Sequence, residues 1–250
     1  GMEPNKSYVQ KCISKGLPVI EGDAEKELIQ FSEKSGIPMA STLLGLSAIS
    51  CHHKNYVGYL GMHGNYGPNV KTNEADLLIA IGMRFDDRVT GDTSKYGINA
   101  KIIHIEIDPS EINKIIKTDV AVNADAKQAL INLLPFINKN EYKNWMNEFK
   151  KCDEIEFNKI IKKELNHKSK KIKMTEVIHL ISEMTNGKSI IVTDVGQHQM
   201  IASRYYKFTK PKSNITSGGL GTMGFALPAS MGAKLGQPKR EVIAITSLFG

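Results

Sequence analysis

Two arginines and two aspartates lie close together directly after an apolar run. The run ends at Gly82, and the segment 84–88 begins with Arg84, ends with Arg88 and carries both aspartates between them. A guanidinium group can form two parallel hydrogen bonds with a phosphate or a carboxylate, so both arginines suit an anionic ligand. A surface loop whose acids and arginines pair with one another would have the same composition. The sequence leaves both interpretations open.

Glu106 is a candidate for binding a nucleotide ribose. It stands 24 residues after Gly82, close to the interval at which a nucleotide-binding sheet places an acid on a ribose hydroxyl. The sequence has no G-x-G-x-x-G motif, so the dinucleotide fingerprint is incomplete. Asp125, a further acid in this region, can equally serve as a helix cap. Spacing alone therefore leaves nucleotide binding open.

Two glycine-rich segments, residues 60–67 and 217–224, are further candidates for ligand binding. Glycine lets the backbone approach a ligand closely and leaves N–H groups available to phosphate. The first segment also carries Met62 and His63, although a plain turn would explain its glycines equally well. The second leads into a run of small residues at 225–233, which indicates a helix packed closely on a sheet.

The elements that must position these residues alternate between apolar strands and helices. Asp108 and Asp125 are suitable N-caps, so we expect helices to begin directly after them. This alternation is typical of an α/β fold with parallel sheets and right-handed crossovers. Ligands of such sheets gather at the carboxyl ends of the strands. The predicted strands are 77–82, 101–107, 120–122, 189–194 and 241–245.

The positive charge of the chain is concentrated in one segment. The net charge is +7, and residues 139–173 hold 11 lysines against 6 acids. Apolar residues recur there at helical spacing, which indicates a solvated helical connector between two domains. No aromatic platform or nucleic-acid-binding motif accompanies the charge, so we expect no nucleic-acid partner.

Cysteine content and hydropathy narrow the class of protein further. The three cysteines form no C-x-x-C pair, which argues against a zinc knuckle or disulfide framework and favours a reducing compartment. No apolar run approaches the roughly 18 residues of a membrane span, and the first residues lack the apolar core of a signal peptide. His52 and His53 have no convincing partner ligands, and His104 alternates with apolar residues in a strand. We expect a cytoplasmic protein with no membrane association and no metal site of its own.

Four sequence blocks resemble the large catalytic subunit of acetolactate synthase (acetohydroxyacid synthase), a thiamine-diphosphate enzyme. The blocks are residues 60–64, 84–91, 195–200 and 216–224. Their order along the chain and their separation also match those in this family, and the likeness extends over residues 24–245. The resemblance implies a transferase of branched-chain amino-acid biosynthesis. Such an enzyme decarboxylates pyruvate on thiamine diphosphate and condenses the product with a second 2-oxo acid.

The resemblance implies roles for residues at the matching positions. Arg88 matches an arginine that holds the carboxylate of the second 2-oxo acid, with Met62 nearby. The family's activating glutamate lies in another domain, so no catalytic residue is assigned here. Positions matching the contacts of FAD, which is not a redox agent in this reaction, are Thr42, Leu43, Gly61, Met62, His63, Gly82, Met83, Arg84, Asp86, Arg88, Val89, Glu106, Ile107, Asp125 and Ala126. Positions around thiamine diphosphate are Val195, Gly196, Gln197, His198, Gly221 and Met223.

The resemblance also implies a domain organisation. We expect an atypical N-terminal extension at 1–23, a central FAD-associated domain at 24–137, the lysine-rich helical connector at 138–173, and an incomplete thiamine-diphosphate-binding domain at 174–250. Residues 247–250 stand where the family has the Gly-Asp-Gly that helps to hold Mg²⁺. The Mg²⁺ site is therefore expected to be absent and the other two cofactor sites partial. We expect the isolated chain to be inactive.

Partners and alternatives follow from the same resemblance. In the family, pyruvate and 2-oxobutyrate are substrates, active sites form within a homodimer or tetramer, and a regulatory subunit often associates. We expect this chain to expose apolar surface and to self-associate. One alternative is another thiamine-diphosphate enzyme, such as a glyoxylate carboligase or pyruvate oxidase, although the segment 84–88 argues against it. Another alternative is a non-catalytic flavin-binding or structural module.

Overall fold

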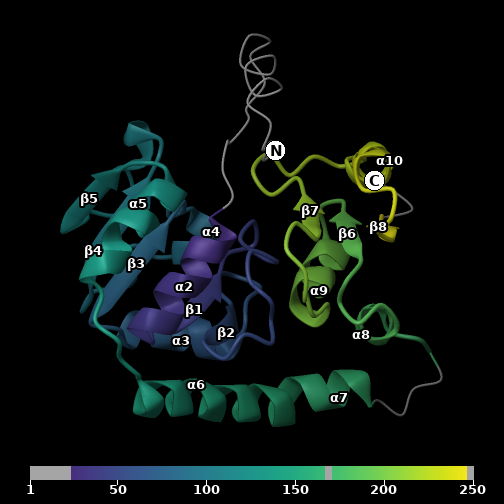
Figure 1. Ribbon diagram of the computed structural model, residues 1–250. Helices are drawn as coiled ribbons and strands as arrows, with labels where there is room; N and C mark the ends of the chain where they lie inside the picture. Colours follow the sequence, from purple (N-terminus) through teal and green to yellow (C-terminus); the bar gives the residue numbers. More distant parts are fainter. Residues whose placement is uncertain (1–23, 167–170, 247–250) are drawn as a thin grey trace. The chain divides into compact units, whose positions relative to one another are not determined.

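The computed structural model has a mixed α/β fold with parallel sheets, which confirms the predicted fold class (Figure 1). The chain divides into two compact units, and each is described by itself. The domain boundaries expected from the resemblance stay a prediction, and the expected extension lies outside the described residues. The structure describes residues 24–166 and 171–246, of which the first unit contains 24–37 and Asn73–Glu141 and the second contains Pro38–Thr72 and the residues from Tyr142 onward.

The first unit is built on a three-stranded parallel sheet with β4 in the centre. Its elements are α2 (Glu25–Ser35), β3 (Leu77–Ile81), α4 (Asp87–Thr90), β4 (Lys101–Glu106), the 3-10 turns η1 (Pro109–Glu111) and η2 (Leu134–Phe136), β5 (Val120–Asn123) and α5 (Ala126–Leu133). Strand β4 pairs with β3 from Leu77 opposite Lys101, and with β5 from Ile103 opposite Val120. The three strands coincide with predicted strands to within one residue, because β-branched runs suit a sheet covered on its faces.

The core of the first unit joins the sheet to a loop. Ala80 and Ile102 of the strands pack with Phe85, Tyr96 and Ile116, which lie outside them. All five are buried. The loop that follows β3 is therefore attached to the sheet by apolar contacts.

The helix expected after Asp108 is only a single 3-10 turn. The Asp108 carboxylate does accept a hydrogen bond from the Ser110 N–H at 2.9 Å, as an N-cap should. The backbone becomes extended at Ile112, and Asn113 has a left-handed φ of 59°. The cap chemistry was predicted correctly, but the residues that follow do not continue a helix.

The second unit contains a parallel pair, β1 and β2, and a three-stranded parallel sheet in the order β7-β6-β8. Its elements are β1 (Met39–Ser41), β2 (Tyr56–Tyr59), α3 (Tyr66–Glu74, whose last two residues belong to the first unit), α6 (Lys143–Glu156), the π-helix η3 (Phe157–Ile161), α7 (Lys162–Leu165), α8 (Met174–Met184), β6 (Ile190–Thr193), α9 (Gln197–Tyr205), β7 (Asn214–Thr216), α10 (Ala226–Gly236) and β8 (Val242–Ile245). All four residues of β6 are buried. Aromatic residues Tyr205, Tyr206 and Phe208 pack with Ile191 of this strand to form the main core.

The lysine-rich segment is helical, as predicted, but it is not fully solvated. Helix α6 continues through η3 into α7, and the three run in line (Figure 1). Phe149, Cys152 and Glu156 are buried along one face of α6. These residues make the helix part of the folded second unit.

Among the described helices of the chain, none is both long and apolar enough to cross a membrane.

Candidate functional site

The carboxyl ends of β3, β4 and β5 form one edge of the first unit's sheet. Gly82 follows β3 with a φ of +60°, and no atom lies within 4 Å of the position a β-carbon would occupy. Glu106, the last residue of β4, is buried, and its Oε1 accepts a hydrogen bond from the Asp108 N–H at 3.1 Å. Open space beside a buried carboxylate at a strand edge suits a nucleotide-like ligand.

The segment after β3 is ordered by its own charges. Asp86 caps α4 by accepting a hydrogen bond from the Arg88 N–H at 3.0 Å, and it also forms an ion pair with Arg84. The backbone hydrogen bond and the nearby guanidinium lower the pKa of Asp86. The Arg88 side chain lies 3.9 Å from Asp87 and is 72% exposed. Both arginines therefore pair with an acid of the same segment, as in the self-paired interpretation, although the Arg88 side chain stays largely exposed.

Phe85 anchors this segment, and the sequence reasoning missed it. Its side chain is 1% exposed and lies edge-on to His104, with ring centroids 5.0 Å apart, and to Tyr96. Its φ of 54° is in the left-handed region, which is rare for a bulky residue. One signal for this buried anchor was present in the sequence, because an aromatic residue stands there between charged neighbours. His104, fully buried in β4, has the structural role that the sequence favoured.

Asp125 is a helix cap in the structure. Its Oδ1 accepts a hydrogen bond from the Gln128 N–H at 3.0 Å at the start of α5. Ala126 is the first residue of that helix, and Ile107 is exposed directly after β4. The first unit thus gathers ten of the predicted FAD positions at or directly after its strand ends: Gly82, Met83, Arg84, Asp86, Arg88, Val89, Glu106, Ile107, Asp125 and Ala126.

The other five predicted FAD positions lie in the second unit, after β1 and β2. Thr42 and Leu43 follow β1, and Gly61, Met62 and His63 follow β2. The two strands are parallel, so both sets lie at the same edge of the pair. Met62 is 56% exposed.

Hydrogen bonds hold the loop after β2 in a tight conformation. Asn65 bonds back to Tyr59 twice, through its side-chain oxygen at 3.0 Å and its backbone N–H at 2.6 Å. The Asn69 side chain bonds the N–H and the carbonyl of Gly61, both at 2.9 Å. A β-carbon at Gly64 would lie 2.4 Å from the Tyr59 carbonyl oxygen, so only glycine fits.

The start of α9, directly after β6, has the features of an anion site. Within the described parts of the chain no side chain caps this helix, so the N–H groups of its first turn have no side-chain acceptor there. His198 in this turn is 6% exposed, and its buried Nε2 has no hydrogen-bond partner among the described residues. Gly196 has a φ of 145°, and a β-carbon there would lie 3.1 Å from the His198 ring.

The loop after β7 lies next to the start of α9. A β-carbon on Gly221 would lie 3.9 Å from the Val195 side chain. Gly221 has a φ of +65°, and Met223 is exposed. The structure thus brings the predicted thiamine-diphosphate positions Val195, Gly196, Gln197, His198, Gly221 and Met223 to one edge of the sheet.

A buried carboxylate fixes the helix that follows this loop. The Asp194 side chain, directly after β6, accepts a hydrogen bond from the Ala226 N–H at 2.7 Å. Ala226 is the first residue of α10 and is fully buried. The end of β6 and the start of α10 are therefore held together.

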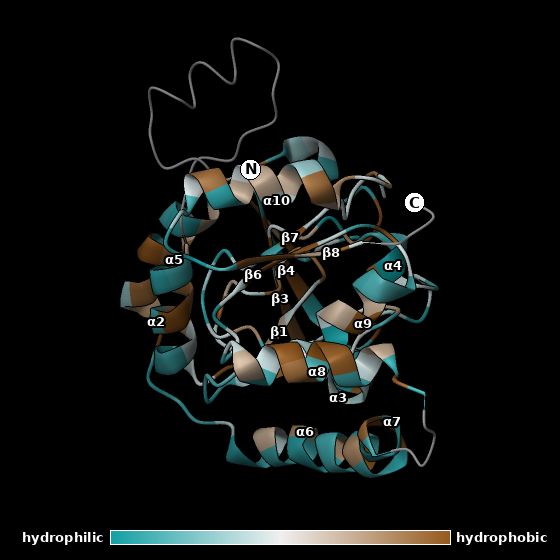
Figure 2. Cartoon of the chain, turned by 90° about the vertical axis from the view of Figure 1, so that its right-hand side faces the viewer, coloured by the Kyte–Doolittle hydropathy of each residue, from teal (hydrophilic) through white to brown (hydrophobic). Residues whose placement is uncertain are grey.

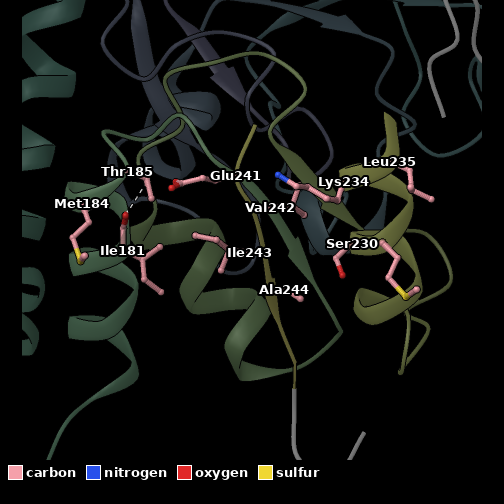
Figure 3. Close-up of a pocket in the computed structure, with 11 residues that line it drawn as sticks. Ile181, Met184, Thr185, Ser230, Lys234, Leu235, Glu241, Val242, Ile243 and Ala244 are labelled. Carbon is pink, nitrogen blue, oxygen red and sulfur yellow. Dashed lines mark hydrogen bonds between the residues drawn. The ribbon is translucent and has the colours of Figure 1, made fainter. Parts of the chain in front are cut away.

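A separate apolar groove of about 850 Å³ lies between α8, β8 and α10 (Figure 3). Met184 of α8 and Leu235 of α10 line it and are strongly exposed. Both helices carry apolar stretches on their surfaces (Figure 2). None of the residues predicted to bind a cofactor lines this groove. It is an exposed apolar surface, as the sequence led us to expect.

Two family models match the chain. Residues 8–133 match the thiamine pyrophosphate enzyme central domain, and residues 194–247 match the C-terminal thiamine pyrophosphate binding domain. The chain belongs to the thiamine pyrophosphate enzyme family. The second match begins at Asp194 and includes the start of α9 and the loop after β7.

Curated proteins similar to this chain include acetolactate synthase large subunits. The chain is 42% identical over 238 residues to that of Buchnera aphidicola subsp. Schizaphis graminum, covering 92% of this chain and 40% of the relative. It is 45% identical over 215 residues to that of Lactococcus lactis, covering 85% and 36%. It is 37% identical over 238 residues to isozyme 3 of Escherichia coli, covering 92% and 41%. The chain thus spans about two fifths of the length of these curated relatives.

Proposed function

We propose that this chain is part of an acetolactate synthase large subunit and contributes binding surfaces for thiamine diphosphate and FAD. The observation that carries the proposal is the unpartnered Nε2 of buried His198 at the uncapped start of α9. At the uncapped start of a helix, a bound anion would supply the hydrogen bond that this buried nitrogen lacks. Similarity to acetolactate synthase large subunits supports the choice of reaction.

Thiamine diphosphate, when bound, supplies the electron sink for decarboxylating a 2-oxo acid. This chain's part is to hold the diphosphate. The N–H groups of the first turn of α9 and the imidazole of His198 are donors for its oxygens, and the positive end of the helix dipole favours its charge. Gly221 keeps the adjacent loop free of side-chain bulk.

The first unit's strand edge supplies a surface for FAD. Gly82 leaves room for a ligand at the end of β3, and Glu106 offers a carboxylate to a ribose hydroxyl. Arg84 adds positive charge beside this space. FAD has no redox role in this proposal.

The substrates in this proposal are pyruvate and 2-oxobutyrate. Within the first unit, the exposed guanidinium of Arg88 suits the carboxylate of a 2-oxo acid. Within the second unit, Met62 is an exposed apolar side chain, and the resemblance is the basis for giving it a part in substrate binding. No group of three or more His, Cys, Asp or Glu in the described parts of the chain could hold a metal ion. Residues 247–250, which stand where the family has its Gly-Asp-Gly, lie outside the described residues.

We further propose that the working enzyme is a cytoplasmic homodimer or tetramer, with a regulatory subunit bound. This chain by itself should not turn over pyruvate. An acetoin colour assay with pyruvate, thiamine diphosphate, magnesium and FAD tests this, and turnover would contradict it.

Calorimetric titration of thiamine diphosphate with magnesium tests the binding site directly. His198→Ala should weaken binding at least tenfold, because it removes a buried donor. His52, an exposed histidine of the same unit, provides the matched control, and His52→Ala should leave the affinity unchanged. Equal affinities of His198→Ala and the unsubstituted chain would contradict the assignment. A flavin absorbance band after purification would support the FAD surface.

A further inference from the structure

Glu156, the last residue of α6, is a buried carboxylate with partners on two different segments. Its side chain is 4% exposed. One oxygen accepts a hydrogen bond from the Tyr66 N–H at 3.1 Å, and the Asn65 amide lies 3.3 Å from the same oxygen. The other oxygen forms an ion pair with Arg204. A carboxylate is buried at this depth only when such partners compensate its lost hydration.

The first segment is the glycine-rich loop that carries Met62 and His63. Asn65 closes this loop by accepting a hydrogen bond from the Tyr59 N–H, and it uses its amide nitrogen to reach Glu156. The loop is thus tied to β2 on one side and to α6 on the other. Its conformation depends on a charge that lies far away in the sequence.

The second segment is α9, whose first turn carries His198. Arg204 lies near the other end of the same helix and is mostly buried, and its Nε has no hydrogen-bond partner among the described residues. Its guanidinium forms an ion pair with the Glu156 carboxylate through Nη2. A short helix moves as a rigid body, so a contact at one end also sets the position of the other.

Two further features set Glu156 apart from the rest of its helix. The π-helix η3 begins directly after it, and π-helical turns are rare and recur at functional sites. The neighbouring carboxyl of Asp153 has its pKa raised to about 6, by burial of the group and then by the charge of Glu156, while Lys207 opposes the shift. This shift occurs although Asp153 as a residue is exposed. The Asp153 and Glu156 carboxyl groups therefore lie close enough to influence each other.

We propose that Glu156 is a positioning residue that couples the Met62–His63 loop to α9, and so sets the geometry of the two ligand-binding segments of this unit. The proposal rests on the proposed function for the identity of the ligands. Its structural basis is one carboxylate that bonds both segments at once, through Asn65 and Tyr66 in the loop and Arg204 in α9, none of which is assigned to a cofactor.

Hydrogen exchange on the full chain tests the coupling, with Glu156→Gln as the variant and Glu154→Gln as the matched control. Glu154 is an exposed acid on the same helix. Glu156→Gln should speed exchange on the order of tenfold in both 60–66 and 197–205, because both lose a charged partner. Glu154→Gln should change neither segment. Acceleration in only one segment, or in none, would overturn the coupling.

A second variant keeps the test decisive if Glu156→Gln fails to fold. Arg204→Met removes the α9 contact and leaves every loop residue in place. If Glu156 couples the two segments, exchange in 60–66 should also accelerate, because the carboxylate loses its counter-charge. An effect confined to 197–205 would overturn the proposal.

Thiamine diphosphate affinity separates a positioning role from a purely structural one. Glu156→Gln should weaken binding about tenfold without touching the ligand, while Glu154→Gln leaves it unchanged. Faster exchange with unchanged affinity would assign Glu156 a structural role only and overturn the proposal. If the unsubstituted chain binds no thiamine diphosphate, the proposed function fails by itself, and the exchange data still decide whether the segments are coupled.

Discussion

Replacing Phe85 by alanine should strongly destabilise the first unit. The ring is buried against His104 and Tyr96 and joins the arginine-bearing loop to the sheet. Truncating a buried phenylalanine to alanine costs about 3–5 kcal/mol, from lost apolar burial and the cavity left behind. We therefore expect Phe85→Ala to lower the free energy of unfolding by about that amount.

The backbone at this position makes a second, sharper expectation possible. With a φ of 54°, Phe85 adopts a conformation that costs an L-residue about 1–2 kcal/mol. Glycine adopts it freely, whereas in a helix or strand glycine is less stable than alanine by about 0.5–1 kcal/mol. Phe85→Gly should therefore be more stable than Phe85→Ala by about 1 kcal/mol, the reverse of the usual order.

Urea unfolding followed by far-ultraviolet circular dichroism measures both effects. With a slope of about 1.5 kcal/mol per molar urea, a loss of 3–5 kcal/mol lowers the midpoint by about 2–3 M. Phe136, 82% exposed in the same unit, provides the control, and Phe136→Ala should change stability by less than about 0.5 kcal/mol. The reasoning is refuted if Phe85→Ala behaves like the control. The argument about backbone conformation is refuted separately if Phe85→Gly is less stable than Phe85→Ala.

Three further expectations concern other parts of the molecule. Gly64→Ala should destabilise the second unit by at least about 2 kcal/mol, because its β-carbon would overlap a backbone oxygen at 2.4 Å. Gly232→Ala within α10 is the control, since no atom of the described residues lies within 4 Å of its added β-carbon. It should be neutral or stabilising by up to about 1 kcal/mol in the same urea assay. The pKa of Asp86 is lowered in the folded chain by a backbone N–H and by a nearby guanidinium. Its carboxylate therefore stabilises the fold above about pH 4, and this contribution disappears as the pH falls further. Asp86→Asn, which can still cap α4, should show a smaller difference in urea midpoint between pH 7 and pH 3 than the unsubstituted chain. Met231→Lys combined with Leu235→Lys should reduce self-association through the exposed groove, and an unchanged sedimentation coefficient would argue against that surface.

The strands that the sequence predicted share one property, a short apolar run bounded by turn residues. β3, β4 and β6 are such runs, and the structure places them almost where the pattern does. β1 and β2 were missed because neither is a continuous apolar run, since β1 ends in Ser41 after two residues and Gly58 interrupts β2. Such short strands form because parallel pairing and the packing of Tyr59 stabilise them, and neither contact is visible in the local sequence.

Helix caps show what the local sequence can predict about a helix and what it cannot. Asp108 and Asp125 have the same side chain and make the same kind of hydrogen bond to a backbone N–H. One is followed by a single turn and the other by α5, since only the residues after Asp125 bury an apolar face, at Ala129 and Leu130. A cap predicts where a helix can begin, and packing decides how long it continues.

The predicted cofactor positions rest on the family resemblance and stay predictions, whereas neither the resemblance nor a motif singled out Glu156. Its partners are separated from it by 48 to 91 residues, and only the fold brings them together. A signal was nonetheless present. Phe149, Cys152 and Glu156 recur at the spacing of one helix face, so the pattern placed a carboxylate in line with two buried residues. Because an uncompensated carboxylate cannot stay buried, an acid at such a position implies a cation and hydrogen-bond donors from elsewhere in the chain. Here those groups come from the two segments that carry the candidate ligand contacts, which is why the charge pattern of this connector bears on function.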